Sequence, residues 1–346
     1  MFLFVSCVVI TNTFGTNIPE PDRYTRPPLL NQVKVFQTQK KSNKMTELSG
    51  KIFNDETFYH LESKEHKETE PVVICVHGIG SYHVHFESLR AALVNENFTV
   101  LSFDLKGRGH SPFPSSLTDE NGDSVFNGDG HVKQMRDLIV GLNLHQRKYH
   151  LIGHSMGGTI VALYGRKYGA DNEILSLTML TQAGLMDLGI VKTIRSWKCT
   201  HSLIKYMLRG NTSAFWNDFH LKGEDALPQA TNAVEKLIEI NQKHPHIFDA
   251  FWETAVHFPL SDNEAAVQQL AAHHHINTLI MWADKDAVVP LEPNFKRWTD
   301  IYEAAEHPNL QTKVFKNAAH CFFIEQDVEF NQDMIRFLKD GKLMDS

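Results

Sequence analysis

The chain has 346 residues, of which 42% are hydrophobic and 22% are charged, and its formal net charge is -7. This balance is that of an ordinary globular protein with a sizeable core, built as one large α/β domain with an insertion or as two domains. The acidic charge and the lack of a long Lys/Arg block argue against a nucleic-acid partner, and no apolar run approaches the roughly 20 residues of a membrane-spanning helix.

The first 44 residues differ in character from the rest of the chain. Met1 to Ile10 is almost wholly apolar, as in a secretory signal, but the first basic residue is Arg23, so the positive start of a signal is missing. Residues 16–44 have the composition of a polar linker with prolines, and Met45 precedes the foldable part. We expect residues 1–44 to be either a signal and linker or an upstream extension, which leaves a secreted and a cytoplasmic location equally open.

Strands and helices alternate from about residue 50 onward, which predicts a mostly parallel sheet with helices on both faces. A continuous apolar run predicts a strand covered on both faces at residues 71–76. Further strands are predicted at residues 98–103, 149–152, 174–180, 279–282 and 311–315. Apolar residues at helical spacing predict helices at residues 84–96, 131–145, 156–168, 293–305 and 325–339. The alternation stops between residues 185 and 275, which look largely helical, so this segment is expected to be an insertion in the sheet domain.

The sequence shows no pattern that predicts a metal or a cofactor. The four cysteines are spaced for neither a zinc site nor a disulfide framework. The run His273-His274-His275 is expected to be a solvated loop, because adjacent residues point in different directions and chelate poorly. We therefore expect no metal site and no cofactor.

The most informative local pattern is Gly153-His154-Ser155-Met156-Gly157, a match to G-x-S-x-G. A predicted strand precedes it directly and a predicted helix follows it directly. A serine on so sharp a turn needs glycine two positions away on either side, because larger side chains would collide there. The turn also places the hydroxyl at a helix N-terminus, where the helix dipole favours negative charge. Ser155 is therefore the candidate nucleophile, and the alternative is a glycine-rich turn without chemistry.

A serine nucleophile needs a base, and the base needs an acidic group that orients it. His320 follows the last predicted strand after a short loop, at the edge of the sheet where open α/β folds bind ligands. Asp284 and Asp286 both follow the strand at 279–282, and the residues alone leave the choice between them open. Both aspartates could instead cap the next turn.

Two backbone N–H groups are expected to stabilise an oxyanion. One is that of Met156, directly after the candidate nucleophile. The other is that of Ile79, in the segment His77-Gly78-Ile79-Gly80 that follows the first central strand. The alternative for this segment is a simple turn.

These motifs together resemble the α/β-hydrolase superfamily, and more narrowly its branch of esterases, monoglyceride-lipase-like enzymes and C–C hydrolases. The resemblance spans about residues 50–340 and rests on ordered matches at His77–Gly80, Asp104–Ser111, Gly153–Gly158, Trp282–Pro290 and His320. It implies an α/β-hydrolase core formed by residues 45–184 and 276–346. It also selects Asp286 over Asp284 as the acid.

The chain departs from the family pattern at a few positions. Ala283 and Ala319 stand where the family usually has glycine, and both are still small. Glu325 stands where acyltransferase-like members of the family have aspartate, which disfavours that activity. Dehalogenases and epoxide hydrolases of the family carry aspartate at the nucleophile, so Ser155 argues against those reactions.

The resemblance implies that residues 185–275 form a helical lid over the site. Three of the five tryptophans lie in this segment and either line an apolar substrate pocket or form the core of the lid itself. We expect hydrolysis of a small or lipid-like carboxylic ester, monoacylglycerols included, with transient contact of the lid with membrane surfaces. The alternatives are a C–C bond hydrolase with the same triad and a non-catalytic binding protein, and the oligomeric state is not predicted.

Overall fold

The computed structural model describes residues 36–42, 45–52, 57–64, 69–188, 219–221 and 246–343, together with single helical positions between 228 and 243. All of them belong to one compact unit, Lys34–Ser346. Within these ranges, every helix is too short or too polar to cross a membrane.

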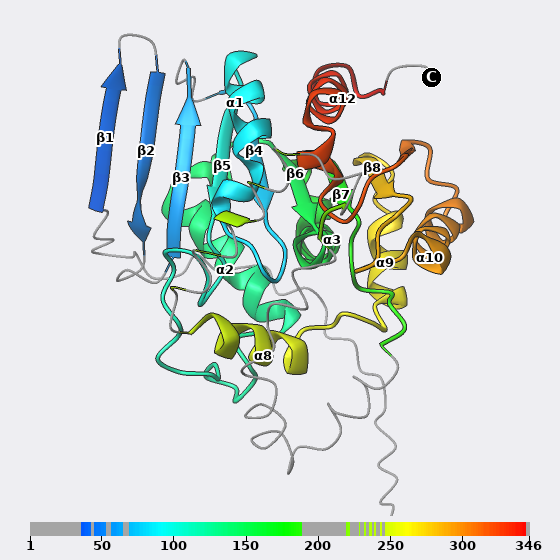
Figure 1. Ribbon diagram of the computed structural model, residues 1–346, viewed down its shortest axis with the longest axis horizontal. Coiled ribbons are helices and arrows are strands. Elements are labelled where there is room, and N and C mark those ends of the chain that lie inside the picture. Colours follow the sequence, from blue (N-terminus) through cyan, green and yellow to red (C-terminus); the bar gives the residue numbers. More distant parts are fainter. Residues whose placement is uncertain are drawn as a thin grey trace, which may run out of the picture. The chain divides into compact units, whose positions relative to one another are not determined.

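The described strands form one sheet of nine in the order β1-β2-β3-β5-β4-β6-β7-β8-β9, which Figure 1 shows from the β1 side to β8. The strands are β1 (Phe36–Ser42), β2 (Met45–Ile52), β3 (Thr57–Ser63), β4 (Val72–Val76), β5 (Thr99–Phe103), β6 (Tyr149–His154), β7 (Ile174–Leu180), β8 (Asn277–Ala283) and β9 (Leu310–Phe315). The antiparallel pairs are β1 with β2, β2 with β3, and β3 with β5. All pairs among β4 to β9 are parallel. The predicted, mostly parallel sheet is therefore confirmed.

The three antiparallel strands were not predicted, and β1 lies within residues 16–44, where a linker was expected. The sequence of β1, FQTQKKS, is mostly polar and carries no apolar signal. Its backbone nevertheless pairs with β2 along its whole length, from Phe36 opposite Lys51 to Ser42 opposite Met45. A strand at the end of a sheet is held by the backbone bonds of one neighbour, so apolar patterning is a weak guide to it.

The parallel strands are in a register that brings their carboxyl ends to one edge of the sheet. Val76 at the end of β4 lies opposite Phe103 of β5 and Gly153 of β6. On the other side of β6, His154 lies opposite Leu180, the last residue of β7. The loops that follow these strands therefore meet at this edge, where sites in open α/β folds are found.

The helices whose bounds are described are η1 (His83–Phe86), α1 (Glu87–Asn95), α2 (Gly128–Gly141), η2 (Leu144–Gln146), α3 (Met156–Tyr168), η3 (Gly169–Asp171), α8 (Ile247–His257), α9 (Glu264–Ala271), α10 (Leu291–Ala304), α11 (Phe322–Glu325) and α12 (Asp327–Asp340). Those that cover the sheet form two groups. Helix α1 packs with α12, whereas α2 packs with α3, α3 with α9, and α9 with α10 (Figure 1).

The two groups cover opposite faces of the sheet. Val73 and Cys75 of β4 join one buried cluster with side chains of α1 and α12. Because successive side chains of a strand point to opposite faces, Val72, Ile74 and Val76 face the other helices. All five residues are at most 1% exposed, and full burial of such a side chain is worth about 1.5–3 kcal/mol.

The segment 185–275, expected to be a lid, is described only in part. Its helix α9 packs against α3 and α10, in the layer of helices beside the sheet. Trp252 in α8 is nearly buried, with 7% of its surface exposed. The other two tryptophans of this segment, Trp197 and Trp216, lie outside the described residues. The lid thus stays a prediction.

Candidate active site

Ser155 lies on a sharp turn between β6 and α3. Its backbone angles are φ 55 and ψ -119, a conformation that costs a non-glycine residue about 1–3 kcal/mol. The surrounding backbone holds the turn in place. The Ser155 N–H donates to the carbonyl oxygen of Leu180 at 2.9 Å, and the Ser155 carbonyl oxygen accepts the N–H groups of Gly158 at 3.0 Å and Ala183 at 3.2 Å.

The glycines around Ser155 are required by close backbone approaches. A Cβ atom on Gly153 would overlap the carbonyl oxygen of Gly157, and one on Gly157 would overlap the carbonyl oxygen of Val76. These approaches let α3 begin directly above the ends of β4 and β6. The structure therefore gives the G-x-S-x-G pattern the strand-turn-helix setting that was expected for it.

His320 and Asp286 form a buried pair in the loops after β9 and β8. The Nδ1 atom of His320 lies 2.7 Å from Oδ2 of Asp286, and both side chains are completely buried. The other carboxylate oxygen, Oδ1, accepts the backbone N–H groups of Val288 and Val289, each at 2.8 Å. Three hydrogen bonds thus fix the carboxylate, and the carboxylate in turn fixes the imidazole ring.

The second ring nitrogen of His320 is available for proton transfer. Its Nε2 atom is buried and makes no hydrogen bond with the described residues, Ser155 included. With the proton on Nδ1 donated to Asp286, Nε2 carries the lone pair and can accept a proton. Hydrogen bonds between base and nucleophile are often long until substrate binds.

His154, the neighbour of Ser155, connects the nucleophile turn to the His320 loop. Its Nε2 atom lies 3.0 Å from the His320 carbonyl oxygen, and the two rings are 4.5 Å apart. Burial, and then the nearby rings of His320 and His85, hold the pKa of His154 well below its ordinary value. The ring is therefore neutral, and its Nε2–H donates to the His320 backbone.

The two aspartates that follow β8 have different surroundings. Asp284 is only partly buried, and its Oδ1 accepts the N–H of Ala318 at 3.4 Å. Its own N–H donates to the carbonyl oxygen of Phe315. The structure places Asp286, and not Asp284, against His320.

The segment His77–Gly80 lies beside the nucleophile. A Cβ atom on Gly78 would be 3.2 Å from the Cβ of Ser155. His77 holds the segment, because its Nδ1 donates to the Gly78 carbonyl oxygen at 2.8 Å and its Nε2 accepts the N–H of Leu105 at 2.9 Å. Burial lowers the pKa of His77 to about 4, so the ring is neutral and Nε2 can act as the acceptor. Met156 follows Ser155 directly, and Ile79 follows Gly78, which approaches Ser155. Both residues expected to stabilise an oxyanion therefore lie close to the nucleophile in the chain or in space.

A buried arginine ties this segment to helix α8. The Nε of Arg108 donates to the Ile79 carbonyl oxygen at 2.7 Å, and its guanidinium also donates to the Oγ1 of Thr254 at 2.7 Å and the carbonyl oxygen of Ala250 at 3.3 Å. Burial lowers the pKa of Arg108 to about 9. Arg108 lies in the Asp104–Ser111 match to the family pattern, but this contact was not predicted from the sequence.

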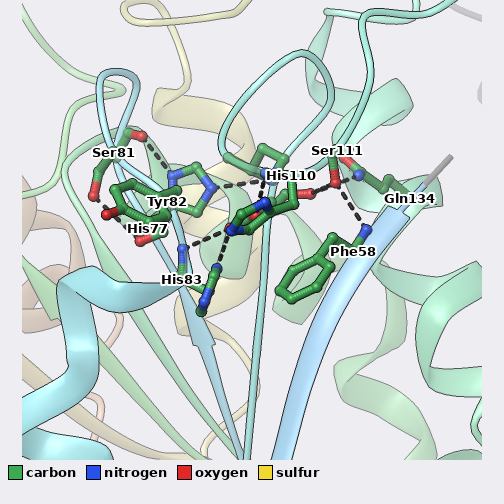
Figure 2. Close-up of polar contacts among 11 residues, drawn as sticks. Phe58, His77, Ser81, Tyr82, His83, His110, Ser111 and Gln134 are labelled. Atoms are coloured by element: carbon green, nitrogen blue, oxygen red, sulfur yellow. Dashed lines mark hydrogen bonds and ion pairs between the residues drawn. The ribbon is translucent and has the colours of Figure 1, made fainter. Parts of the chain in front are cut away.

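The turn that carries Arg108 is fastened by Asp104. Its carboxylate accepts the N–H and Nδ1–H of His83 and the N–H of His110, at 2.7–2.8 Å. Its carbonyl oxygen accepts Ser111 Oγ–H and the amide of Gln134 (Figure 2). Burial raises the pKa of Asp104, but the surrounding hydrogen bonds and charges, those of His83 first and then those of His77 and His110, together hold it below its ordinary value. All carboxylate bonds here are internal, so this cluster supports the site.

Glu325 is a further residue of the site that sequence reasoning noticed only as a departure from the acyltransferase pattern. Its carboxylate accepts the N–H of Ala319, next to His320, and the N–H of Leu221, each at 2.7 Å. Phe219 presents its ring to that of His320 at right angles, with the ring centres 5.2 Å apart. Burial raises the pKa of Glu325, against the two backbone N–H bonds. Part of the segment between β7 and β8 is thus fixed to the His320 loop.

Comparisons with known proteins identify the family and the fold. The model of the family described as Serine aminopeptidase, S33, matches residues 67–327. Lipase 3 of Moraxella sp. (strain TA144) is 23% identical over 339 residues, which cover 97% of this chain and 94% of that protein. Monoacylglycerol lipase ABHD6 of Homo sapiens is 21% identical over 273 residues, 78% of this chain and 75% of that protein. The solved esterase EaEST from Exiguobacterium antarcticum superimposes with a TM-score of 0.60 at 19% identity, over 82% of this chain and 96% of that chain.

Proposed function

The chain belongs to the serine aminopeptidase S33 family of α/β-hydrolases. Within this family, we propose that it is a serine hydrolase of carboxylic esters, small or lipid-like, monoacylglycerols included. The match confirms the predicted superfamily and fold. The observation that carries the proposal is the buried pair of His320 and Asp286, 2.7 Å apart, in the loops that meet the strained Ser155 turn.

In the proposed reaction, the Oγ of Ser155 attacks the ester carbonyl carbon while Nε2 of His320 takes the hydroxyl proton. Asp286 holds the ring in the required tautomer and stabilises the imidazolium. The alcohol leaves with the proton from His320, and an acyl-enzyme forms on Ser155. Water then attacks the acyl-enzyme with His320 again as the base, and the acid is released.

The backbone N–H groups of Ile79 and Met156 stabilise the oxyanion in this proposal. Each such donor is worth about 2.7–4 kcal/mol of the barrier. The neutral His77 and the buried Arg108 fix the Ile79 segment by hydrogen bonds to the carbonyl oxygens of Gly78 and Ile79, respectively.

Family membership alone does not decide which bond is cleaved, because the family description names an aminopeptidase. Esters are favoured because two relatives that match most of this chain are named as lipases, and a structural neighbour is named as an esterase. The bond can be tested directly with one panel of substrates for each class.

The panel contains p-nitrophenyl esters of increasing acyl length, a monoacylglycerol, an amino-acid p-nitroanilide and a vinylogous diketone. We expect the wild type to turn over esters fastest, and Ser155→Ala and His320→Ala to be inactive. Faster cleavage of the anilide or the diketone would assign the triad to peptide or C–C bonds. Full ester turnover by Ser155→Ala would contradict the proposal.

A further inference from the structure

The segment Thr181–Gly184, directly after β7, contacts both the base and the nucleophile. Thr181 Oγ1 donates to the carbonyl oxygen of His320 at 3.4 Å. Two residues further, the Ala183 N–H donates to the carbonyl oxygen of Ser155. Gln182 stands between these two contacts and is completely buried. It packs on the first turn of α3, because a Cβ on Gly158 would lie 2.5 Å from the Gln182 Cβ.

The amide of Gln182 has no use inside the described fold. Its Nε2 and Oε1 are both buried, and neither makes a hydrogen bond with the described residues. An unpaired buried polar group costs about 1–3 kcal/mol. Leucine or methionine would therefore serve packing better at this position.

Gln134 shows what a structural glutamine looks like in this protein. It is also buried, with 4% of its surface exposed. Its Nε2 donates to Thr57 Oγ1 and to the Asp104 carbonyl oxygen, and its Oε1 accepts the N–H of Lys106. Both atoms of its amide are thus engaged, in contrast to those of Gln182.

A second unpaired polar group, the hydroxyl of Thr159, lies on the first turn of α3, against which Gln182 packs. Thr159 is 1% exposed, and its Oγ1 makes no hydrogen bond with the described part of the chain. It stands four residues after Ser155, on the same side of α3. Gly184 brings the segment close to it, because a Cβ on Gly184 would lie 3.2 Å from Thr159 Oγ1. Two buried polar side chains without hydrogen-bond partners among the described residues therefore lie close to the nucleophile, Thr159 one helical turn after Ser155 and Gln182 against the first turn of α3.

We propose that Gln182 is a specificity-determining residue that binds a hydroxyl group of the substrate near the reacting ester, with Thr159 as a weaker second contact. An amide donates and accepts hydrogen bonds, and a hydroxyl group does both in return. An alkyl group can satisfy neither atom. This inference rests on the proposed ester hydrolysis and deepens it. The hydroxyl belongs either to the alcohol part or to the acyl part of the ester.

The test compares three esters of similar size: a plain alkyl ester, one with a hydroxyl in the alcohol part, and one with a hydroxyl in the acyl part. Gln182→Met keeps the shape of the side chain and removes the amide, and Gln182→Leu is a second apolar variant. We expect kcat/KM for one hydroxylated ester to fall about 10- to 100-fold, the equivalent of one or two lost hydrogen bonds. The plain ester should change less than about threefold, and the melting temperature should stay equal or rise, because an unpaired polar group is removed. Which hydroxylated ester is affected identifies the source of the hydroxyl.

Gln134→Met is the matched control. It breaks internal bonds, so it should lower the melting temperature and change all three esters alike. An equal loss on all three esters for the Gln182 variants, or no loss on any, would overturn the inference and leave ester hydrolysis standing. A wild type that cleaves none of the three would instead refute the proposed function.

Discussion

Replacing Asp286 by asparagine tests how the structure orients His320. The Oδ1 of Asp286 accepts two backbone N–H groups at 2.8 Å, and Oδ2 faces Nδ1 of His320 at 2.7 Å. Asparagine has one oxygen, and the two N–H donors hold it on the Oδ1 side. The amide NH2 then faces Nδ1, and the ring can accept this bond only by carrying its proton on Nε2.

That tautomer cannot take the proton of Ser155. In Ser-His-Asp enzymes, the corresponding change lowers kcat by about 10⁴, which is about 5 kcal/mol of transition-state free energy. We expect a loss of this size for Asp286→Asn. Shape and buried volume are conserved, so the variant should remain folded.

Asp284→Asn is the matched control, because it changes the neighbouring aspartate in the same way. Asp284 accepts one long hydrogen bond, from the Ala318 N–H at 3.4 Å, and asparagine keeps an oxygen for it. We expect less than about a twofold change in kcat and a change in stability within about 0.5 kcal/mol. The assay is turnover of a p-nitrophenyl ester, with circular dichroism to verify folding. Loss of turnover in Asp284→Asn with activity retained in Asp286→Asn would show that Asp286 does not orient His320.

Three further predictions concern the support of the site. Gly157→Ala should abolish ester turnover and lower the urea midpoint of unfolding, because the new Cβ would overlap the Val76 carbonyl oxygen. A variant with native stability and activity would be inconsistent with the turn described. Burial lowers the pKa of His85 to about 3, so the unfolded chain binds the extra proton below about pH 6.5, and stability is lost as pH falls through this window. When the pH falls from 7 to 5, the unfolding free energy of His85→Phe should therefore decrease by about 2 kcal/mol less than that of the wild type. Equal decreases in urea titrations would show that His85 does not cause the loss of stability. Glu325→Gln leaves one oxygen for two N–H donors, one of them from Leu221. It should therefore lower the free energy of unfolding by about 1–3 kcal/mol in thermal unfolding and lower kcat. Unchanged values would show that the carboxylate is not needed.

Much of the parallel sheet could be predicted because its strands are buried on both faces. The segments predicted as strands overlap β4, β6 and β8, whose residues are all buried except the first of β8, and sequence patterning is strongest for such strands. The G-x-S-x-G turn was predictable for a related reason, since its glycines are imposed by backbone contacts that are local to the motif.

The strands β1 to β3 could not be predicted in the same way. They are antiparallel, and the sequence of β1 is mostly polar, so pairing of the backbone decides their place. Residue patterns left Asp284 and Asp286 open, because the choice depends on the course of two separate loops. Only the resemblance to the family selected Asp286 before the structure placed it against His320.

Contacts between distant segments were the hardest to foresee. Arg108 reaches helix α8, 142 residues away in the chain, and Glu325 reaches Leu221, 104 residues away. Neither contact leaves a periodic or spaced signal in the sequence. Gln182 leaves no signal in the sequence either. It stands out only because its buried amide makes no hydrogen bond with the described residues.

Labelling with a fluorophosphonate probe tests whether Ser155 is an activated nucleophile, without any assumption about the substrate. The probe reacts with serines whose hydroxyl proton is taken by a base, and mass spectrometry of the labelled protein identifies the modified residue. We predict a single adduct on Ser155 in the wild type and none in Ser155→Ala or His320→Ala. Labelling of Ser155→Ala to the same extent as the wild type, or a wild type that stays unlabelled while fully folded, would show that Ser155 is not an activated nucleophile.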